Sequence, residues 1–191
     1  MKPSGARSCS RRAALALLFA PAIGPVRGAA AASELPPDIV LLRRRGLQLP
    51  VAGVTAEQLV DTYTQARAGS TGRHDAIDIP APRGTPVLAV ADGTVKKLFL
   101  SKPGGLTLYQ FDDSASFSFY YAHLDRYADS IREGQRLRKG QVIGFVGSTG
   151  NAPAQAPHLH FAVLRLGLEP KWWEGTPLNP FLLWRDPAPA R

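Results

Sequence analysis

The feature that most constrains the fold is a series of short β-prone segments separated by turn-forming residues. Valine, isoleucine, leucine and aromatic residues gather in short runs, and glycine, proline, aspartate and asparagine stand between the runs. Segments of this kind are typical of antiparallel sandwiches and barrels. The sequence therefore predicts a mainly β fold, an antiparallel β-sandwich or partly open barrel. We expect its strands at residues 76–79, 87–91, 94–98, 106–111, 117–122, 142–146 and 159–164.

A short N-terminal helix is expected before the first strand. Thr55 and Gln58 have the spacing of a capping box, in which the two residues satisfy each other's backbone groups at a helix start. We predict a helix over residues 56–66 and an extended lead-in over residues 33–54. The residues expected on the buried side of this helix are Leu59, Val60 and Tyr63. Residues 33–66 together form an N-terminal extension.

Residues 1–32 have the features of an export signal peptide. The basic pair Arg11-Arg12 precedes an apolar run at residues 13–26, and small residues follow at 28–32. The apolar run is short and interrupted by prolines, so we expect no stable membrane span in the mature chain. The signal predicts an exported protein of the periplasm or cell envelope.

Charge and cysteine usage limit the partners and the chemistry. Residues 1–32 carry +5 of the net charge of +8 and the rest carries +3, a surplus that does not require nucleic acid. We expect no nucleic-acid partner. The single cysteine, Cys9, lies in the predicted signal, so the mature chain has no thiol. Any metal must then be held by histidines and carboxylates.

Two of the four histidines flank one residue in an apolar run. His158 and His160 are two positions apart, so on a strand their rings project from the same face, with Cα atoms about 6–7 Å apart. At this separation one ring can bind a metal while the other reaches what the metal activates. The alternative is a pair of ordinary strand histidines that face solvent.

The other two histidines also have suggestive neighbours. His74 precedes Asp78 by four residues, but Pro80 disfavours a helix here, and a flat strand would set the two residues about 13 Å apart. The pair can share an ion only if His74 lies on a loop that turns into a strand containing Asp78. His123 ends the run 117–122, and a half-buried histidine bonded to backbone is the alternative reading.

Three tryptophans lie among prolines and glycines near the C-terminus. We expect Trp172, Trp173 and Trp184 to pack against the sheet, with sugar binding as the alternative. Residues 185–191 are rich in proline and alanine, which predicts a flexible tail.

Seven short motifs occur in order along residues 67–184. They are RHDAID (73–78), PRGTPV (82–87), ADGTV (91–95), YAHL (121–124), GQVIG (140–144), GSTG (147–150) and PHLHF (157–161). Together they resemble the LytM/lysostaphin-type (M23) zinc metallopeptidases. The resemblance implies the LytM fold for residues 67–184, the expected peptidase domain.

The resemblance also implies a site and an activity. One zinc ion would be bound by His74, Asp78 and His160, and His123 and His158 would form the catalytic pair beside its water. The implied reaction is hydrolysis of peptide bonds in peptidoglycan stem peptides or cross-links. We expect a monomer.

Two positions depart from the family pattern, and two other functions compete. Ala76 stands where the motif has glycine, and Ala162 where glutamate is common. A non-catalytic LytM-type regulator that activates a cell-wall amidase is the main alternative, although such proteins lose ligands and all five site positions are intact here. Residues 84–95 and 134–144 have the spacing of turns and strand residues found in lipoyl or biotinyl carriers, so a carrier is a second alternative. The methionine typical of a carrier's attachment hairpin is absent, because Met1 is the only methionine.

Overall fold

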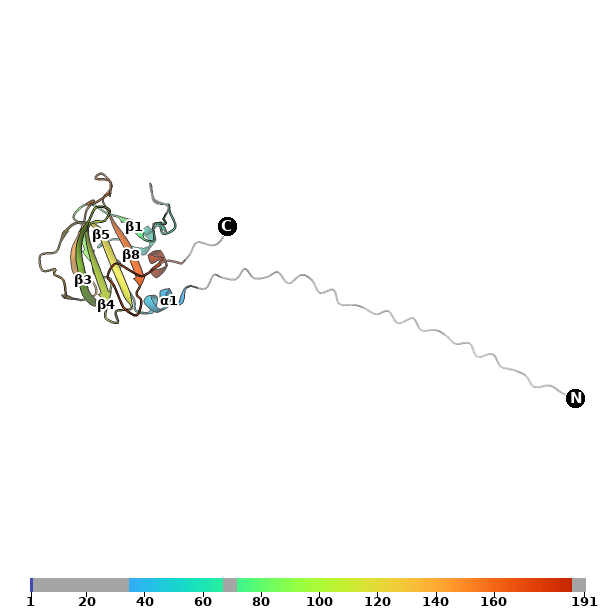
Figure 1. The fold of residues 1–191 in the computed structure, drawn as a ribbon. Helices are drawn as coiled ribbons and strands as arrows, with labels where there is room; N and C mark the ends of the chain where they lie inside the picture. The colour runs from blue at the N-terminus through green and yellow to red at the C-terminus, as the bar shows by residue number, and fades with distance from the viewer. Residues whose placement is uncertain (2–34, 67–71, 187–191) are drawn as a thin grey trace. The chain divides into compact units, whose positions relative to one another are not determined.

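The computed structural model describes residue 1, residues 35–66 and residues 72–186 (Figure 1). Residues 2–32 of the predicted signal peptide and residues 187–191 of the predicted tail lie outside the described residues. Within the described ranges, no helix is both long and apolar enough to cross a membrane.

The strands of the described residues form one antiparallel sheet. Its main path runs β1-β8-β5-β4-β3-β6, and Figure 1 shows β1, β8, β5, β4 and β3 of this path. Off the path, β7 pairs with β5, β2 with β7 and β9 with β8. The bounds are β1 (Ile77–Pro80), β2 (Pro86–Leu88), β3 (Gly93–Ser101), β4 (Gly105–Asp112), β5 (Phe117–Tyr127), β6 (Arg136–Leu137), β7 (Val142–Val146), β8 (His158–Arg165) and β9 (Thr176–Leu178). The predicted fold class, mainly antiparallel β, is confirmed.

The predicted helix at 56–66 is wrong. Only a single 3₁₀ turn, η1 (Ala56–Gln58), forms there, and Leu59 is already extended. The Gln58 side chain does accept a hydrogen bond from the Thr55 amide, at 2.8 Å. Two polar side chains of this segment form hydrogen bonds to distant residues. The Thr62 hydroxyl accepts from the Asp78 amide at 3.1 Å, and the Tyr63 hydroxyl donates to the Pro177 carbonyl. These contacts require an irregular backbone.

The burial predicted for that segment is correct only in part. Leu59 is buried, whereas Val60 is 60% exposed and Tyr63 is half-buried. Without the helical period, neighbouring positions no longer share one buried face.

The N-terminal helix lies in the stretch that was expected to be extended. Helix α1 (Pro37–Arg44) begins with a proline, which is favourable at the first helical position, and buries Ile39 and Leu42. Arg43 in its last turn pairs with Asp186 at 2.8 Å and donates to the carbonyl of Leu182 in the 3₁₀ helix η2 (Pro180–Leu183). These contacts join α1 to the C-terminal end of the range 72–186.

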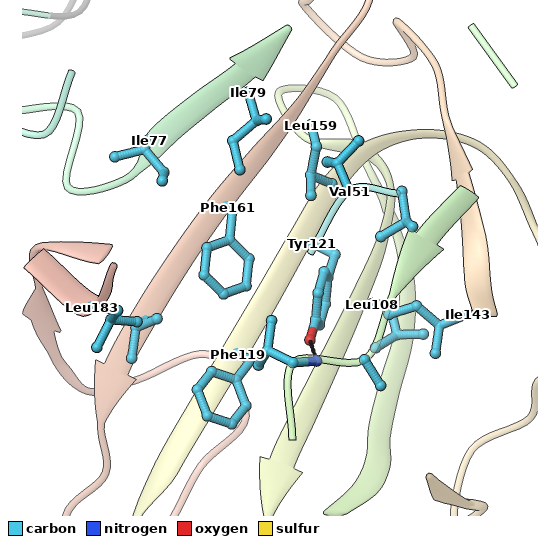
Figure 2. Close-up of a cluster of buried hydrophobic side chains, with 14 of the residues drawn as sticks. Val51, Ile77, Ile79, Leu108, Phe119, Tyr121, Ile143, Leu159, Phe161 and Leu183 are labelled. Atoms are coloured by element: carbon cyan, nitrogen blue, oxygen red, sulfur yellow. Dashed lines mark hydrogen bonds between the residues drawn. The ribbon is translucent and has the colours of Figure 1, made fainter. Parts of the chain in front are cut away.

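Alternation along the central strands separates the core from the opposite face. In β5, Phe119 and Tyr121 are fully buried, and they meet Phe161 and Leu159 of β8 (Figure 2). The buried Tyr121 hydroxyl accepts from the Val90 amide at 3.1 Å (Figure 2) and donates to Gln110 at 2.7 Å. The core thus fixes the register of β5 and β8.

The residues that alternate with these core residues point to the opposite face of the sheet, and on β8 they include His158 and His160. Asp78 of β1 lies directly opposite His160 of β8, and His160 lies opposite Ala122 of β5. Residues opposite each other in an antiparallel pair project from the same face. The fold therefore brings Asp78, His158 and His160 to the face that the core leaves open.

Candidate metal centre

Three donor atoms from two strands and one loop meet on this face. Asp78 and His160 are cross-strand neighbours, and His74 lies on the loop before β1, as the four-residue spacing requires. The His74 Nε2 atom is 3.0 Å from His160 Nδ1 and 3.1 Å from Asp78 Oδ1, and His160 Nδ1 is 3.0 Å from Asp78 Oδ1. The structure thus brings together all three residues predicted as ligands.

The turn between His74 and Asp78 accommodates an alanine. The left-handed residue of the turn is Asp75, at φ 53°, and Ala76 does not have a positive φ. Ala76 is fully buried behind the loop. Glycine is therefore not required at this position, and the first departure from the family pattern leaves the three donors in place.

The donor set fits a tetrahedral zinc ion. Zinc bonds of roughly 2.0 Å at tetrahedral angles set neighbouring donors about 3.3 Å apart, close to the separations found here. The His74 Nδ1 atom lies 3.1 Å from the Thr62 carbonyl, which can only accept, so this nitrogen carries the proton and Nε2 carries the lone pair.

The carboxylate of the set is ionised. Burial by itself raises the pKa of Asp78, but the nearby ring nitrogens of His160 and His74, at 3.0 and 3.1 Å, outweigh it and hold the pKa well below its usual range. Nitrogen lone pairs and an anion this close together are stable only with a proton or a cation between them. The described residues His74, Asp78 and His160 form a group able to hold a metal ion.

The remaining two histidines stand next to the donors. The rings of His123 and His158 are 4.9 Å apart, and that of His123 is 5.7 Å from that of His160. His123 ends the regular pairing of β5 with β8 and adopts a left-handed backbone, φ 59°, which its amide stabilises by donating to the Gly104 carbonyl at 2.8 Å.

Backbone carbonyls set the tautomer of both rings. The Nδ1 atom of His123 donates to the Thr149 carbonyl at 2.8 Å, and that of His158 donates to the Ala156 carbonyl at 2.9 Å. Each neutral ring therefore keeps its lone pair on Nε2. Burial lowers the pKa of His123 to about 4, so this ring is neutral at neutral pH.

Sequence reasoning missed the residues that hold these rings. Thr62 and Thr149 present carbonyls to His74 and His123, and the Thr149 hydroxyl donates to the Leu124 carbonyl at 2.7 Å. The motif GSTG at 147–150 was the available signal for Thr149. Thr62 had no such signal, because it lies in the segment that was predicted to be helical.

The five residues line one open cleft of about 610 Å³. Gln65 and Ala66 form part of its wall, and the turn at Pro103 and Gly104 forms another part. Among the charged side chains of the described residues, Asp78 is the only carboxylate that lines the cleft, and no lysine or arginine does so. The other lining residues are Tyr109, Tyr120, Ala122, Asn151, Ala152 and Pro153.

Comparison with known proteins identifies the family. The sequence model of Peptidase family M23 matches residues 72–180. The chain belongs to peptidase family M23. The match lies within residues 67–184, where the motifs had suggested an M23 domain.

Two curated M23 relatives illustrate the likeness. The chain is 39% identical over 108 residues to the DD-carboxypeptidase/endopeptidase Mpg of Neisseria meningitidis, covering 56% of this chain and 22% of that protein. It is 35% identical over 118 residues to an L-Ala–D-Glu endopeptidase of Bacillus subtilis, covering 58% of this chain and 36% of that protein. The chain thus spans a fifth to about a third of the length of these relatives.

A solved M23 structure has the same fold. The catalytic domain of lysostaphin from Staphylococcus simulans superposes with a TM-score of 0.53 at 25% identity, covering 75% of this chain and 96% of that domain. The LytM/lysostaphin type of fold, expected from the motifs, is confirmed.

Proposed function

We propose that this M23 chain is an exported zinc metalloendopeptidase that hydrolyses peptide bonds in peptidoglycan stem peptides or cross-links. The observation that carries the proposal is the triangle of His74 Nε2, Asp78 Oδ1 and His160 Nδ1, with sides of 3.0–3.1 Å. Two nitrogens and one carboxylate oxygen are a catalytic zinc set that leaves a fourth position for water.

A zinc ion held by His74, Asp78 and His160 would supply Lewis-acid chemistry: it would polarise the scissile carbonyl and lower the pKa of a bound water towards about 7. The net charge on the protein donors is −1, because both histidines are neutral ligands and Asp78 is ionised.

The two neighbouring histidines handle the proton. One Nε2 lone pair, on His123 or His158, accepts the proton of the attacking water and then delivers it to the leaving amine. The other ring can donate a hydrogen bond to the developing oxyanion only when its Nε2 also carries a proton, that is, as an imidazolium. General acid–base catalysis of this kind contributes about 10²–10⁴ in rate. The carbonyls of Thr149 and Ala156 keep the lone pair of each neutral ring on Nε2, so either ring can act as the base.

Peptidoglycan as the substrate is supported by the family and by the relatives. The two curated relatives have endopeptidase names that specify different bonds, so the bond that this chain cleaves is left open. An extended peptide suits the cleft, because its lining is largely uncharged.

The test is digestion of purified sacculi by the protein with one equivalent of zinc. We expect release of soluble muropeptides, identified by mass spectrometry, and loss of release by at least 100-fold in His123→Ala and His160→Ala. Leu168→Ala is the matched control, because this side chain is fully exposed and outside the cleft. Full activity in both histidine variants would contradict the proposal. Zinc binding without digestion, together with stimulation of an added amidase, would establish the regulator instead.

A further inference from the structure

A row of aromatic rings continues from the metal centre across the sheet. Ring centroids are 5.9 Å apart between His160 and Tyr120, 4.5 Å between Tyr120 and Tyr109, and 4.9 Å between Tyr109 and Trp172. The row ends at Trp173, 5.1 Å from Trp172. We call Tyr120, Tyr109, Trp172 and Trp173 the aromatic row.

Strand register places the first half of the row on the same face as the histidines. Tyr120 of β5 is the cross-strand partner of Tyr109 of β4, and Tyr120 lies two residues before Ala122, the partner of His160. Both tyrosines line the cleft. The row is therefore an extension of the cleft floor and not a separate surface.

The second half of the row comes from the β8–β9 connection. Trp172 packs on Tyr109 and also on Phe99 of β3, at 5.2 Å, so it is held from two sides. Trp173 has no such cover and is 59% exposed. The expectation that the tryptophans pack against the sheet thus describes Trp172 and leaves Trp173 unexplained. A large exposed aromatic next to a cleft is a feature of binding surfaces.

The charge around the row favours a neutral ligand. None of its four members is charged at neutral pH, and the flanking Lys171 and Glu174 pair with each other at 3.1 Å. An acidic or basic ligand would find no counter-charge in the row itself. Flat aromatic faces of this kind pack well against the apolar C–H face of a pyranose ring, while Asn151 adds a polar side chain to the cleft lining.

The distance between His160 and Trp172 also limits which ligand can reach both. Strands are spaced about 4.8 Å apart, so Tyr109, two strands from β8, lies about 10 Å from His160, and Trp172 lies one ring farther on. An extended peptide rises about 3.3 Å per residue, which leaves room for roughly three to five residues between the scissile bond and Trp172. The stem peptide of peptidoglycan is this short, and its far end is attached to an N-acetylated sugar of the glycan strand.

We propose that the aromatic row is a sugar subsite, in which Trp172 and Trp173 bind the N-acetylated sugar that carries the stem peptide. The proposal rests on the proposed function in taking peptidoglycan as the substrate. It makes the enzyme selective for stems that are still attached to glycan over free peptides.

Hydrolysis of two matched substrates tests the selectivity. One is a stem peptide and the other is the same peptide linked to its disaccharide, and kcat/KM is measured for both with the zinc-loaded full chain. We expect the wild type to prefer the linked substrate by about tenfold. Trp173→Ala should reduce this ratio to about one, and the exposed residue Leu168 in the same connection gives a control, Leu168→Ala, that should keep it. A wild-type ratio of one, or the same ratio in Trp173→Ala, overturns the proposal.

A binding titration separates the subsite from catalysis. Chitotetraose, an N-acetylglucosamine oligomer that a peptidase does not cleave, is added to ¹⁵N-labelled protein. The indole N–H signals of the tryptophans and the backbone amide signals of Tyr109 and Tyr120 are followed by NMR. We expect saturable chemical-shift changes at Trp172, Trp173 and Tyr109 in the wild type. The affinity obtained from the Trp172 and Tyr109 signals should be about tenfold lower in Trp173→Ala. This result would uphold the subsite even if neither substrate were hydrolysed. Absence of shifts in the wild type, or equal affinity in Trp173→Ala, overturns it.

Discussion

Replacement of Thr149 by valine tests how the fold positions His123 beside the candidate metal centre. The Thr149 hydroxyl donates to the Leu124 carbonyl at 2.7 Å and accepts from the Leu106 amide at 3.0 Å, so it joins β4 and β5 to the loop before β8. Valine has nearly the same shape but makes neither hydrogen bond. An amide left without a partner costs roughly 1–3 kcal/mol, and the second lost bond adds about 1 kcal/mol. We expect Thr149→Val to lower the free energy of unfolding by about 2–4 kcal/mol in urea titration.

The same change should slow catalysis more than it weakens substrate binding. The Thr149 carbonyl accepts from His123 Nδ1, and the hydroxyl fixes the position of that carbonyl. Removing an outer partner of a catalytic or metal-bound histidine typically costs 10–100-fold. We expect kcat on a soluble stem peptide to fall by about this factor with little change in KM. The ¹⁵N shifts of His123 should show a smaller population of the Nδ1–H tautomer.

Thr149→Ser is the matched control, because it keeps the hydroxyl and loses only a methyl group. It should retain most of the stability, the rate and the tautomer of the wild type. If Thr149→Val is as stable and as active as the wild type, or if Thr149→Ser is damaged equally, the hydroxyl does not position His123 and the reasoning is wrong.

Three further predictions concern metal, glycine and pH. Removal of zinc by a chelator should lower the unfolding temperature, since zinc at 1,000 times its Kd stabilises by about 4 kcal/mol; calorimetry that shows no shift would contradict a bound metal. Gly105→Ala should destabilise by about 2–5 kcal/mol, because Gly105 has φ 64° and a Cβ would overlap Thr149 and Gly150; urea unfolding equal to that of the wild type would contradict this contact. Burial raises the pKa of Asp112, but hydrogen bonds from Ser114, the Phe117 amide and Arg45 hold it below its usual range. The folded state therefore binds a proton at Asp112 less readily than the unfolded state does. The stabilisation of the folded state by the ionised Asp112 is present above about pH 4 and is lost as the pH falls through the lowered pKa of Asp112. Asp112→Asn should cost roughly 2 kcal/mol at pH 7 and much less at pH 2.5; an equal cost at both would refute the assignment.

The sheet and the face that carries His158 and His160 follow from side-chain alternation. Each segment predicted to be a strand overlaps one in the structure, although only residues 87 and 88 of the segment 87–91 are in a strand. Residues such as Phe119, Tyr121 and Phe161 bury the face that their spacing assigns to the core. The same alternation puts His158 and His160 on the other face. The meeting of His74 with Asp78 was expected only on the condition of a loop and a turn, and the positive φ of Asp75 provides that turn.

Elements that depend on distant partners could not be predicted. The segment after Thr55 has a good local helix start, but Thr62 and Tyr63 bond to β1 and to the Pro177 carbonyl, and these long-range contacts outweigh the local preference. Strands β6 and β9 have two and three residues, too few for a periodic pattern. Helix α1 carried recognisable signals at both ends, namely Pro37 and the basic pair at its last turn, which the proline-rich context obscured.

The most direct measurement of the central claim is anomalous diffraction at the zinc absorption edge from crystals of the zinc-loaded protein. The account predicts one anomalous peak per chain, about 2.0–2.2 Å from His74 Nε2, Asp78 Oδ1 and His160 Nδ1, with His123 and His158 outside bonding distance. A peak bound by other residues, or none at this triangle at full zinc loading, would contradict it.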